Sequence, residues 1–129
     1  MYSLTVDDSP TITVANDKHM ISYAVNGALM NPLEAFYASL AGCAGVYAKK
    51  ACKELGVSAE GIAIYCKPFA GPSGPLSLAN FKTEVSFPDH FSAELRARVL
   101  HAIGQCAVKK IFESGGQVGF SVGEARLAA

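Results

Sequence analysis

Apolar and polar residues alternate along the first part of the chain, in segments 3–6, 11–14 and 21–25. A period of two places successive side chains on opposite faces of a β-strand, so each segment predicts a half-buried strand. Asn16, Asp17 and Lys18 separate the second segment from the third. Asn and Asp accept turn conformations, and we therefore expect these two strands to form a hairpin.

The apolar period changes to three or four residues after Asn31. Asn31 suits a helix N-cap, Pro32 the first helical position and Glu34 a capping box. Gly56 suits the end of the same helix. These signals predict a helix from Pro32 to Leu55. Its expected apolar stripe is Leu33, Phe36, Leu40, Cys43, Tyr47, Ala51 and Leu55.

The first half of this helix is also apolar on its other faces, which carry Ala35, Ala38, Ala41, Ala44 and Val46. A helix that is apolar nearly all round is usually buried all round. We therefore expect a central helix whose small residues let neighbouring elements approach closely.

Two more strands are expected after the long helix. Ile62, Ile64 and Cys66 share one face of the first, and the alternation from Leu78 to Phe87 marks the second. The segment from Pro68 to Pro75 is rich in Pro and Gly, and it is predicted to be a loop.

A second helix and a third follow. Ser92 is the expected N-cap, and the apolar stripe consists of Leu95, Val99, Ala102 or Ile103, and Cys106. Gly104 is expected to interrupt the helix, so that Cys106 opens a short third helix through Glu113. The alternation in 118–122 then predicts a last strand. This order of elements predicts an α+β fold, with one domain over residues 1–129.

Composition narrows the classes of function. Half of the 129 residues are hydrophobic, which is enough to form a core, and the formal net charge is zero. A neutral chain lacks the basic surface of a nucleic-acid-binding protein. Mean hydropathy is +0.25, yet no apolar run reaches the roughly 18 residues of a membrane span. With no signal-peptide pattern at the N-terminus, we expect a cytoplasmic protein that buries its apolar excess in a homodimer.

The chain has four cysteines, Cys43, Cys52, Cys66 and Cys106. They form no CxxC pair and have no His at zinc-ligand spacing, so no metal site is predicted. Cys43 and Cys106 lie on the apolar stripes of two predicted helices that would pack on one face of a sheet. Two neighbouring thiols would allow one to reduce an oxidant and the other to condense with the resulting sulfenic acid. The alternative is that both are small core residues.

Two segments resemble the motifs of the OsmC/Ohr family, which comprises osmotically inducible protein C and the organic hydroperoxide resistance proteins. The first is NPLEAFYASLAGC, residues 31–43, and the second is QCAVKK, residues 105–110. The resemblance implies antiparallel sheets with a long central helix and an intertwined homodimer. It also implies a thiol-dependent peroxidase that reduces organic hydroperoxides, with Cys43 peroxidatic and Cys106 resolving. The implied reductant is a dithiol such as a lipoylated protein, with no metal or flavin cofactor.

The sequence departs from the peroxidase pattern at three positions. In those members an acidic residue directly follows the Asn/Ser/Thr-Pro pair and partners an Arg, whereas here Leu33 occupies that position and Glu34 comes next. No Arg precedes Arg96, and Ala107 stands where Pro is usual. Lys18 and Glu34 are the remaining candidates to activate Cys43. Lysine lowers the pKa of a nearby thiol by its charge, but it lacks the planar fork of arginine.

Other interpretations of these residues stay open. The chain is alternatively a non-catalytic dimer that binds a small apolar ligand, or a redox sensor in which the Cys43–Cys106 disulfide is the signal. Glu34 is alternatively only a capping residue. Cys52 is expected on a more polar part of the long helix and Cys66 in a strand, both without a role. Lys49, Lys50, Lys109 and Lys110 are expected on solvated faces.

Overall fold

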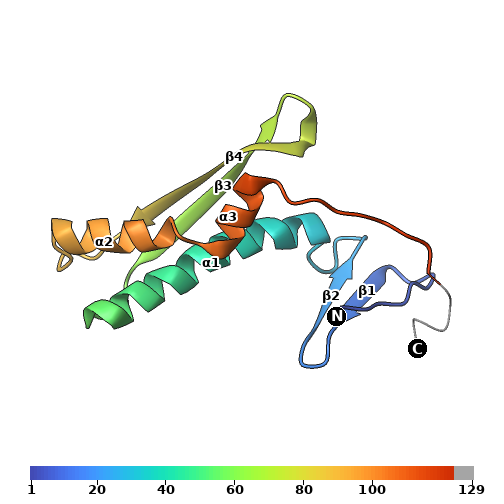
Figure 1. Cartoon of the computed structure of the whole chain (residues 1–129), viewed down its shortest axis with the longest axis horizontal. Helices are drawn as coiled ribbons and strands as arrows, with labels where there is room; N and C mark the ends of the chain where they lie inside the picture. Colours follow the sequence, from blue (N-terminus) through green and yellow to red (C-terminus); the bar gives the residue numbers. More distant parts are fainter. Residues whose placement is uncertain (124–129) are drawn as a thin grey trace. The chain divides into compact units, whose positions relative to one another are not determined.

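The computed structural model describes residues 1–123, with the backbone alone for 75–79. Its elements form two antiparallel two-stranded sheets and three helices (Figure 1). In chain order they are β1 (Thr11–Ala15), β2 (Met20–Ala24), α1 (Pro32–Leu55), β3 (Ala63–Gly71), β4 (Gly74–Ser86), α2 (Ala93–Ile103) and α3 (Ala107–Ser114). This confirms the α+β class, with antiparallel sheets and one long helix. The intertwined homodimer and the single domain over 1–129 stay predictions.

The chain divides into two compact units, and the first contains residues 1–36 and the segment that begins at Gln117. Its β1–β2 hairpin pairs Ile12 with Tyr23. Asn16 Oδ1 accepts hydrogen bonds from the backbone N–H groups of Lys18, at 2.9 Å, and His19, at 2.7 Å. The turn therefore forms where the sequence predicts it, because the Asn side chain satisfies two backbone donors.

Two strands predicted for this unit are absent. Segment 3–6 makes only an isolated bridge from Ser3 to Ala15. Residues 118–122 form no strand, and Val118, Phe120 and Val122 are 78%, 94% and 102% exposed. Both predictions were wrong because a strand also needs a neighbour that supplies backbone hydrogen bonds. No described strand of this chain pairs with residues 118–122.

Helix α1 has both ends where the sequence places them. Asn31 Oδ1 accepts a hydrogen bond from the backbone N–H of Glu34 at 2.9 Å, which satisfies one unpaired donor of the first turn. Gly56 adopts φ +70°, a left-handed conformation that glycine accepts without strain and that ends the helix. Neither α1 nor any other described helix combines the length and apolarity that a membrane crossing requires.

The buried stripe of α1 is rotated from the predicted one. Its members are Leu40, Ala44, Ala48, Ala51 and Cys52. Cys43 and Tyr47 are half-buried at its edge, and Val46 is 62% exposed. The expectation of a helix buried all round was wrong for the described chain, because core residues cover only part of its surface. The placement of Cys52 on a polar part of the helix was also wrong, since it is 1% exposed.

Strands β3 and β4 form a long hairpin in the second unit, residues 37–116. The loop predicted from Pro68 to Pro75 was wrong, because both strands continue to Gly71 and Gly74 around a two-residue turn. In a two-stranded sheet every strand has a free edge, where Pro68 need not donate a hydrogen bond. Gly74 adopts φ +102°, which glycine tolerates.

Helices α2 and α3 follow the predicted pattern of caps. Ser92 Oγ accepts a hydrogen bond from the N–H of Leu95 at 3.2 Å, which confirms the N-cap of α2. The chain leaves α2 at Gly104 and enters α3 after Cys106. Gly115 adopts a left-handed conformation at the end of α3.

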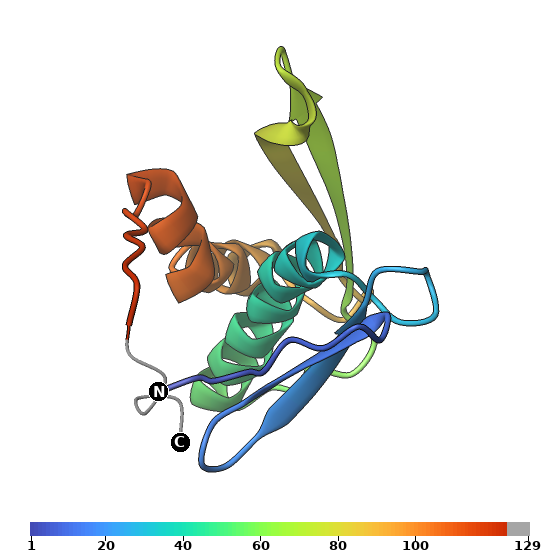
Figure 2. The same cartoon turned by 90° about the vertical axis from the view of Figure 1, so that its right-hand side faces the viewer.

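The core of the second unit lies where α1, α2 and the β3–β4 hairpin meet (Figures 1 and 2). Its buried members are Ala44, Ala48, Ala51, Cys52, Phe91, Val99 and Ile103. The small alanine side chains of α1 form part of this core, and Val99 of α2 is completely buried. Ile64 and Val85, paired across the hairpin, pack against this cluster.

Candidate redox site

Cys43 and Cys106 form a disulfide within the second unit. Cys43 lies on α1 and Cys106 is the N-cap residue of α3, and their Cα atoms are 6.1 Å apart. This Cα separation lies within the range that a disulfide spans. The fold therefore brings together the two thiols that the sequence singles out.

The tight connection between α2 and α3 places Cys106 at this position. The backbone N–H of Gln105 donates to the carbonyl of Ala102 at 3.0 Å, and that of Cys106 donates to the carbonyl of Ile103 at 3.1 Å. These bonds turn the chain directly after α2, at Gly104. Cys106 is buried, as is Ile103, and its sulfur is bonded to that of Cys43 on α1.

The two sulfur-bearing residues differ in exposure. Cys106 is 2% exposed, whereas Cys43 is half-buried. A thiol must be reached by an oxidant before it reacts, and its reactivity follows access as well as ionisation. After reduction, Cys43 would be the more accessible thiol of the pair.

A small apolar cavity of about 100 Å³ lies beside Cys106. Its apolar walls are Leu40 and Ala44 of α1, Phe81 of β4, Ile103 of α2 and Phe112 of α3. Its polar lining comes from Thr83, Lys109 and Glu113. Sequence reasoning did not find this cavity, because its walls come from segments far apart in the chain and no local pattern links them.

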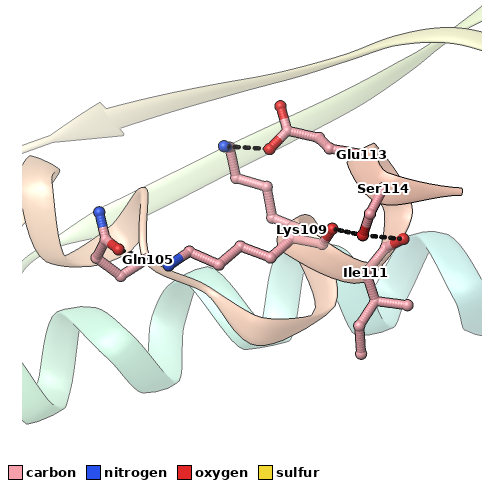
Figure 3. A network of polar contacts seen from close by, with 6 residues as sticks. Gln105, Lys109, Ile111, Glu113 and Ser114 are labelled. Atoms are coloured by element: carbon pink, nitrogen blue, oxygen red, sulfur yellow. Dashed lines mark hydrogen bonds and ion pairs between the residues drawn. The ribbon is translucent and has the colours of Figure 1, made fainter.

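Lys109 and Glu113 form an ion pair along one side of α3 (Figure 3). Their N and O atoms are 2.7 Å apart, and the two side chains are 48% and 57% exposed. Lys110 instead donates to Gln105 Oε1 at 2.7 Å. Both lysines lie at the surface as expected, but Lys109 also lines the cavity.

The two predicted activating residues lie in the first unit. Lys18 belongs to the β1–β2 turn, and only its backbone takes part in that turn's hydrogen bonds. Glu34 is the third residue of α1, where its backbone N–H binds the cap. Its exposed carboxylate makes no hydrogen bond or ion pair with any residue in 1–123. The capping position of Glu34 is thus seen directly, while the activating roles of both residues stay predictions.

The other two cysteines, Cys52 and Cys66, lie outside the disulfide. Burial raises the pKa of the Cys52 thiol, which keeps it protonated and unreactive. Cys66 lies on β3 with its sulfur 3.6 Å from Thr83 Oγ1. Within residues 1–123, no group of His, Cys, Asp and Glu side chains is arranged to hold a metal ion.

The sequence model of OsmC-like proteins matches residues 25–121. The chain belongs to the OsmC-like family. The match includes both helical motifs and both cysteines of the disulfide, so the OsmC-like resemblance inferred from the two motifs is confirmed. No curated protein matches the chain.

Solved structures show the same OsmC-like fold. An OsmC-like protein from Mycoplasma pneumoniae gives a TM-score of 0.71 at 11% identity, covering 89% of this chain and 87% of that one. A protein from Psychrobacter arcticus 273-4, described as an osmotic stress induced and detoxification response protein, gives a TM-score of 0.69 at 13% identity, covering 84% of this chain and 85% of that one. A hypothetical protein from Aquifex aeolicus VF5 gives a TM-score of 0.65 at 15% identity, covering 89% of this chain and 87% of that one. At such identities the likeness establishes the fold alone.

Proposed function

We propose that this OsmC-like protein is a thiol-dependent peroxidase that reduces organic hydroperoxides to alcohols. The observation that carries the proposal is the Cys43–Cys106 disulfide, which would be the product of the oxidising half of such a cycle. Membership of the OsmC-like family supports a stress-related, peroxidase-like function. The Psychrobacter neighbour, described in terms of osmotic stress and detoxification, fits the same class.

The proposed cycle uses two thiols of the chain and an external dithiol as the reductant. The Cys43 thiolate attacks the terminal oxygen of the hydroperoxide, the O–O bond breaks, and the alkoxide leaves and takes up a proton as the alcohol. Cys43 is then a sulfenic acid. The Cys106 thiol attacks its sulfur, the S–O bond breaks, and water leaves as the disulfide forms. A dithiol such as a lipoylated protein then reduces the disulfide by thiol–disulfide exchange and becomes a disulfide itself.

Burial supports this assignment of the two roles. The attacking sulfur must meet a substrate that arrives from solvent, and Cys43 is the half-buried member of the pair. The resolving sulfur need only meet the sulfenic acid, and Cys106 is 2% exposed. A buried resolving thiol is also shielded from oxidation of its own.

Activation of Cys43 is proposed to involve Lys18 and Glu34. A cation beside a thiol lowers its pKa and raises the thiolate fraction at neutral pH. Lys18 would supply that charge in place of the absent arginine, and Glu34 would orient it. The side chain of Lys18 is solvent-exposed. Neither the Lys18 ammonium nor the Glu34 carboxylate is bound to another described residue.

The working form is proposed to be a cytoplasmic homodimer. Many large apolar side chains are exposed in the single chain, and an extensive exposed apolar surface is typical of a protein–protein interface. They include Met20, Ile21, Leu29, Met30, Leu33, Phe36 and Val46. A second copy would cover such a surface, and light scattering together with sedimentation measures the mass directly.

The peroxidase proposal is tested with the fully reduced protein and a slight excess of cumene hydroperoxide. We expect rapid loss of two thiols per chain and a mass lower by two hydrogen atoms, with hydrogen peroxide reacting more slowly. Cys43→Ser should keep its thiols and its mass, whereas Cys66→Ser should lose two thiols and two hydrogen atoms as the wild type does. No thiol loss over minutes would exclude the peroxidase.

A second candidate is binding of a small apolar ligand without turnover. The cavity beside Cys106 favours it, as does the absence of any Arg before Arg96. In that case the reduced protein would keep its thiols in the experiment above. A redox sensor would instead form the disulfide slowly and would not consume a stoichiometric excess of peroxide when a dithiol is supplied.

A further inference from the structure

We propose that Lys109 binds the carboxylate of a short-chain ligand whose apolar end fills the cavity beside Cys106. Lys109 would thus be a specificity-determining residue that selects anionic over neutral molecules. This inference goes beyond the proposed function and does not rest on it, because Cys43 does not line the cavity. The binding preference itself is separate from any turnover.

The walls of the cavity limit what it can hold. Leu40, Phe81, Ile103 and Phe112 surround a volume of about 100 Å³. An apolar cavity of about 150 Å³ can hold one benzene molecule, so this cavity has room for roughly four carbon atoms. The apolar end of the ligand is therefore short, and the remainder of the molecule must reach the rim.

The rim carries one pair of opposite charges. Lys109 and Glu113 are the two charged residues that line the cavity, and they are bound to each other at 2.7 Å. An ion pair that is about half exposed contributes little to stability, because water solvates each partner well when they separate. A ligand carboxylate can therefore replace that of Glu113 on the Lys109 ammonium at small cost.

The geometry of α3 makes Lys109 the anchor rather than its neighbour. Lys110 donates to Gln105 Oε1 at 2.7 Å, and it does not line the cavity. Figure 3 shows Lys109 directed toward Glu113. A cation in the first turn of α3 and an apolar cavity beside it together fit an anion with a short apolar tail.

The test uses unreactive probes on the disulfide form of the full chain. Methyl resonances of Leu40 and Ile103 are followed by NMR during titration with pentanoate, pentan-1-ol and pentan-1-amine. We expect pentanoate to bind about tenfold more tightly than the alcohol, as one charge-assisted hydrogen bond allows. The amine should bind more weakly than the alcohol.

Three variants decide which charge is responsible. Lys109→Gln should remove the preference for pentanoate, and Glu113→Gln should strengthen it because the competing carboxylate is gone. Lys110→Gln, the matched control on the same helix, should leave it unchanged. Equal affinity for pentanoate and pentan-1-ol in wild type, or an unchanged preference in Lys109→Gln, would overturn the proposal.

Failure of this proposal is distinguishable from failure of the peroxidase. Pentanoate carries no peroxide, so its binding is independent of thiol chemistry. If thiols are lost rapidly while pentanoate shows no preference, the peroxidase stands and the role of Lys109 falls. If the preference holds without thiol loss, Lys109 stands as the anchor of a binding protein.

Discussion

The sulfur of Cys43, on α1, is bonded to that of Cys106 at the start of α3, and the bond closes a loop of 63 residues. Closing a loop of this length removes conformational freedom from the unfolded chain, so the oxidised protein should be more stable than the reduced one. We expect a difference of about 2–4 kcal/mol in the free energy of unfolding.

Urea denaturation of the oxidised protein, of the reduced protein and of Cys43→Ser measures this difference. The variant should match the reduced wild type. Cys66→Ser should retain the full effect of oxidation, because Cys66 lies outside the disulfide. Equal urea midpoints of unfolding for the oxidised and reduced proteins would contradict the predicted stabilisation by the disulfide.

Val99 is completely buried between α1, α2 and the hairpin. Val99→Ala removes two methyl groups and leaves a cavity, which should lower the free energy of unfolding by about 2 kcal/mol. Leu100→Ala removes more atoms from the same helix, but Leu100 is 48% exposed. It should therefore cost less, and the reverse order at equal protein concentration would mean that the core is misassigned.

Cys52 and Cys66 are the two free thiols of the oxidised chain. Burial raises the pKa of Cys52, so its thiol stays protonated where an unfolded cysteine, with a pKa of about 8.5, ionises. Alkylation by iodoacetamide should label Cys66 at least about tenfold faster than Cys52. Peptide mass spectrometry at successive times measures both rates, and equal labelling would contradict the buried position.

The raised pKa of Cys52 also fixes a sign for the pH dependence of stability. Below the pKa of an unfolded cysteine both states hold the proton, and the favourable effect of the neutral thiol is complete. As pH rises above that value, the unfolded state loses the proton first, so the free energy of unfolding falls. Cys52→Ala should weaken this alkaline decline, whereas a steeper decline in the variant would be the opposite result.

Gly61 is held in a conformation that other residues avoid. Its φ is +89°, and a Cβ atom there would lie 2.9 Å from Cγ of Pro88. Gly61→Ala should therefore cost about 1–3 kcal/mol in the free energy of unfolding. Gly116→Ala has open space and should change it by less than about 0.5 kcal/mol. Similar values for the two variants would speak against the tight turn before β3.

The long helix was predictable because its limits are local. Asn31 caps the first turn, and Gly56 supplies the left-handed residue at the end. The face that it buries was not predictable, since that depends on what α2 and β3–β4 place against it. The stripe predicted through Cys43 is rotated toward Ala44 and Ala48 for this reason.

Strand predictions failed where pairing is decided at a distance. Alternation in 118–122 resembles that in 11–14, yet only the latter has a paired strand in the described chain. The redox pair was identified from its cysteines and the family motifs. Thr83, Lys109 and Glu113 were not linked to it, because a cavity is a property of packed elements and leaves no periodic mark in a sequence.

In the proposed peroxidase cycle, Cys43 is the thiol that reduces the hydroperoxide. The most direct test is the intact and peptide mass of reduced Cys106→Ser after brief exposure to cumene hydroperoxide. We expect a product one oxygen atom heavier, with a sulfenic acid at Cys43, which dimedone converts to a thioether with loss of water. An unmodified Cys43, or an oxygen found first on Cys66, would contradict it.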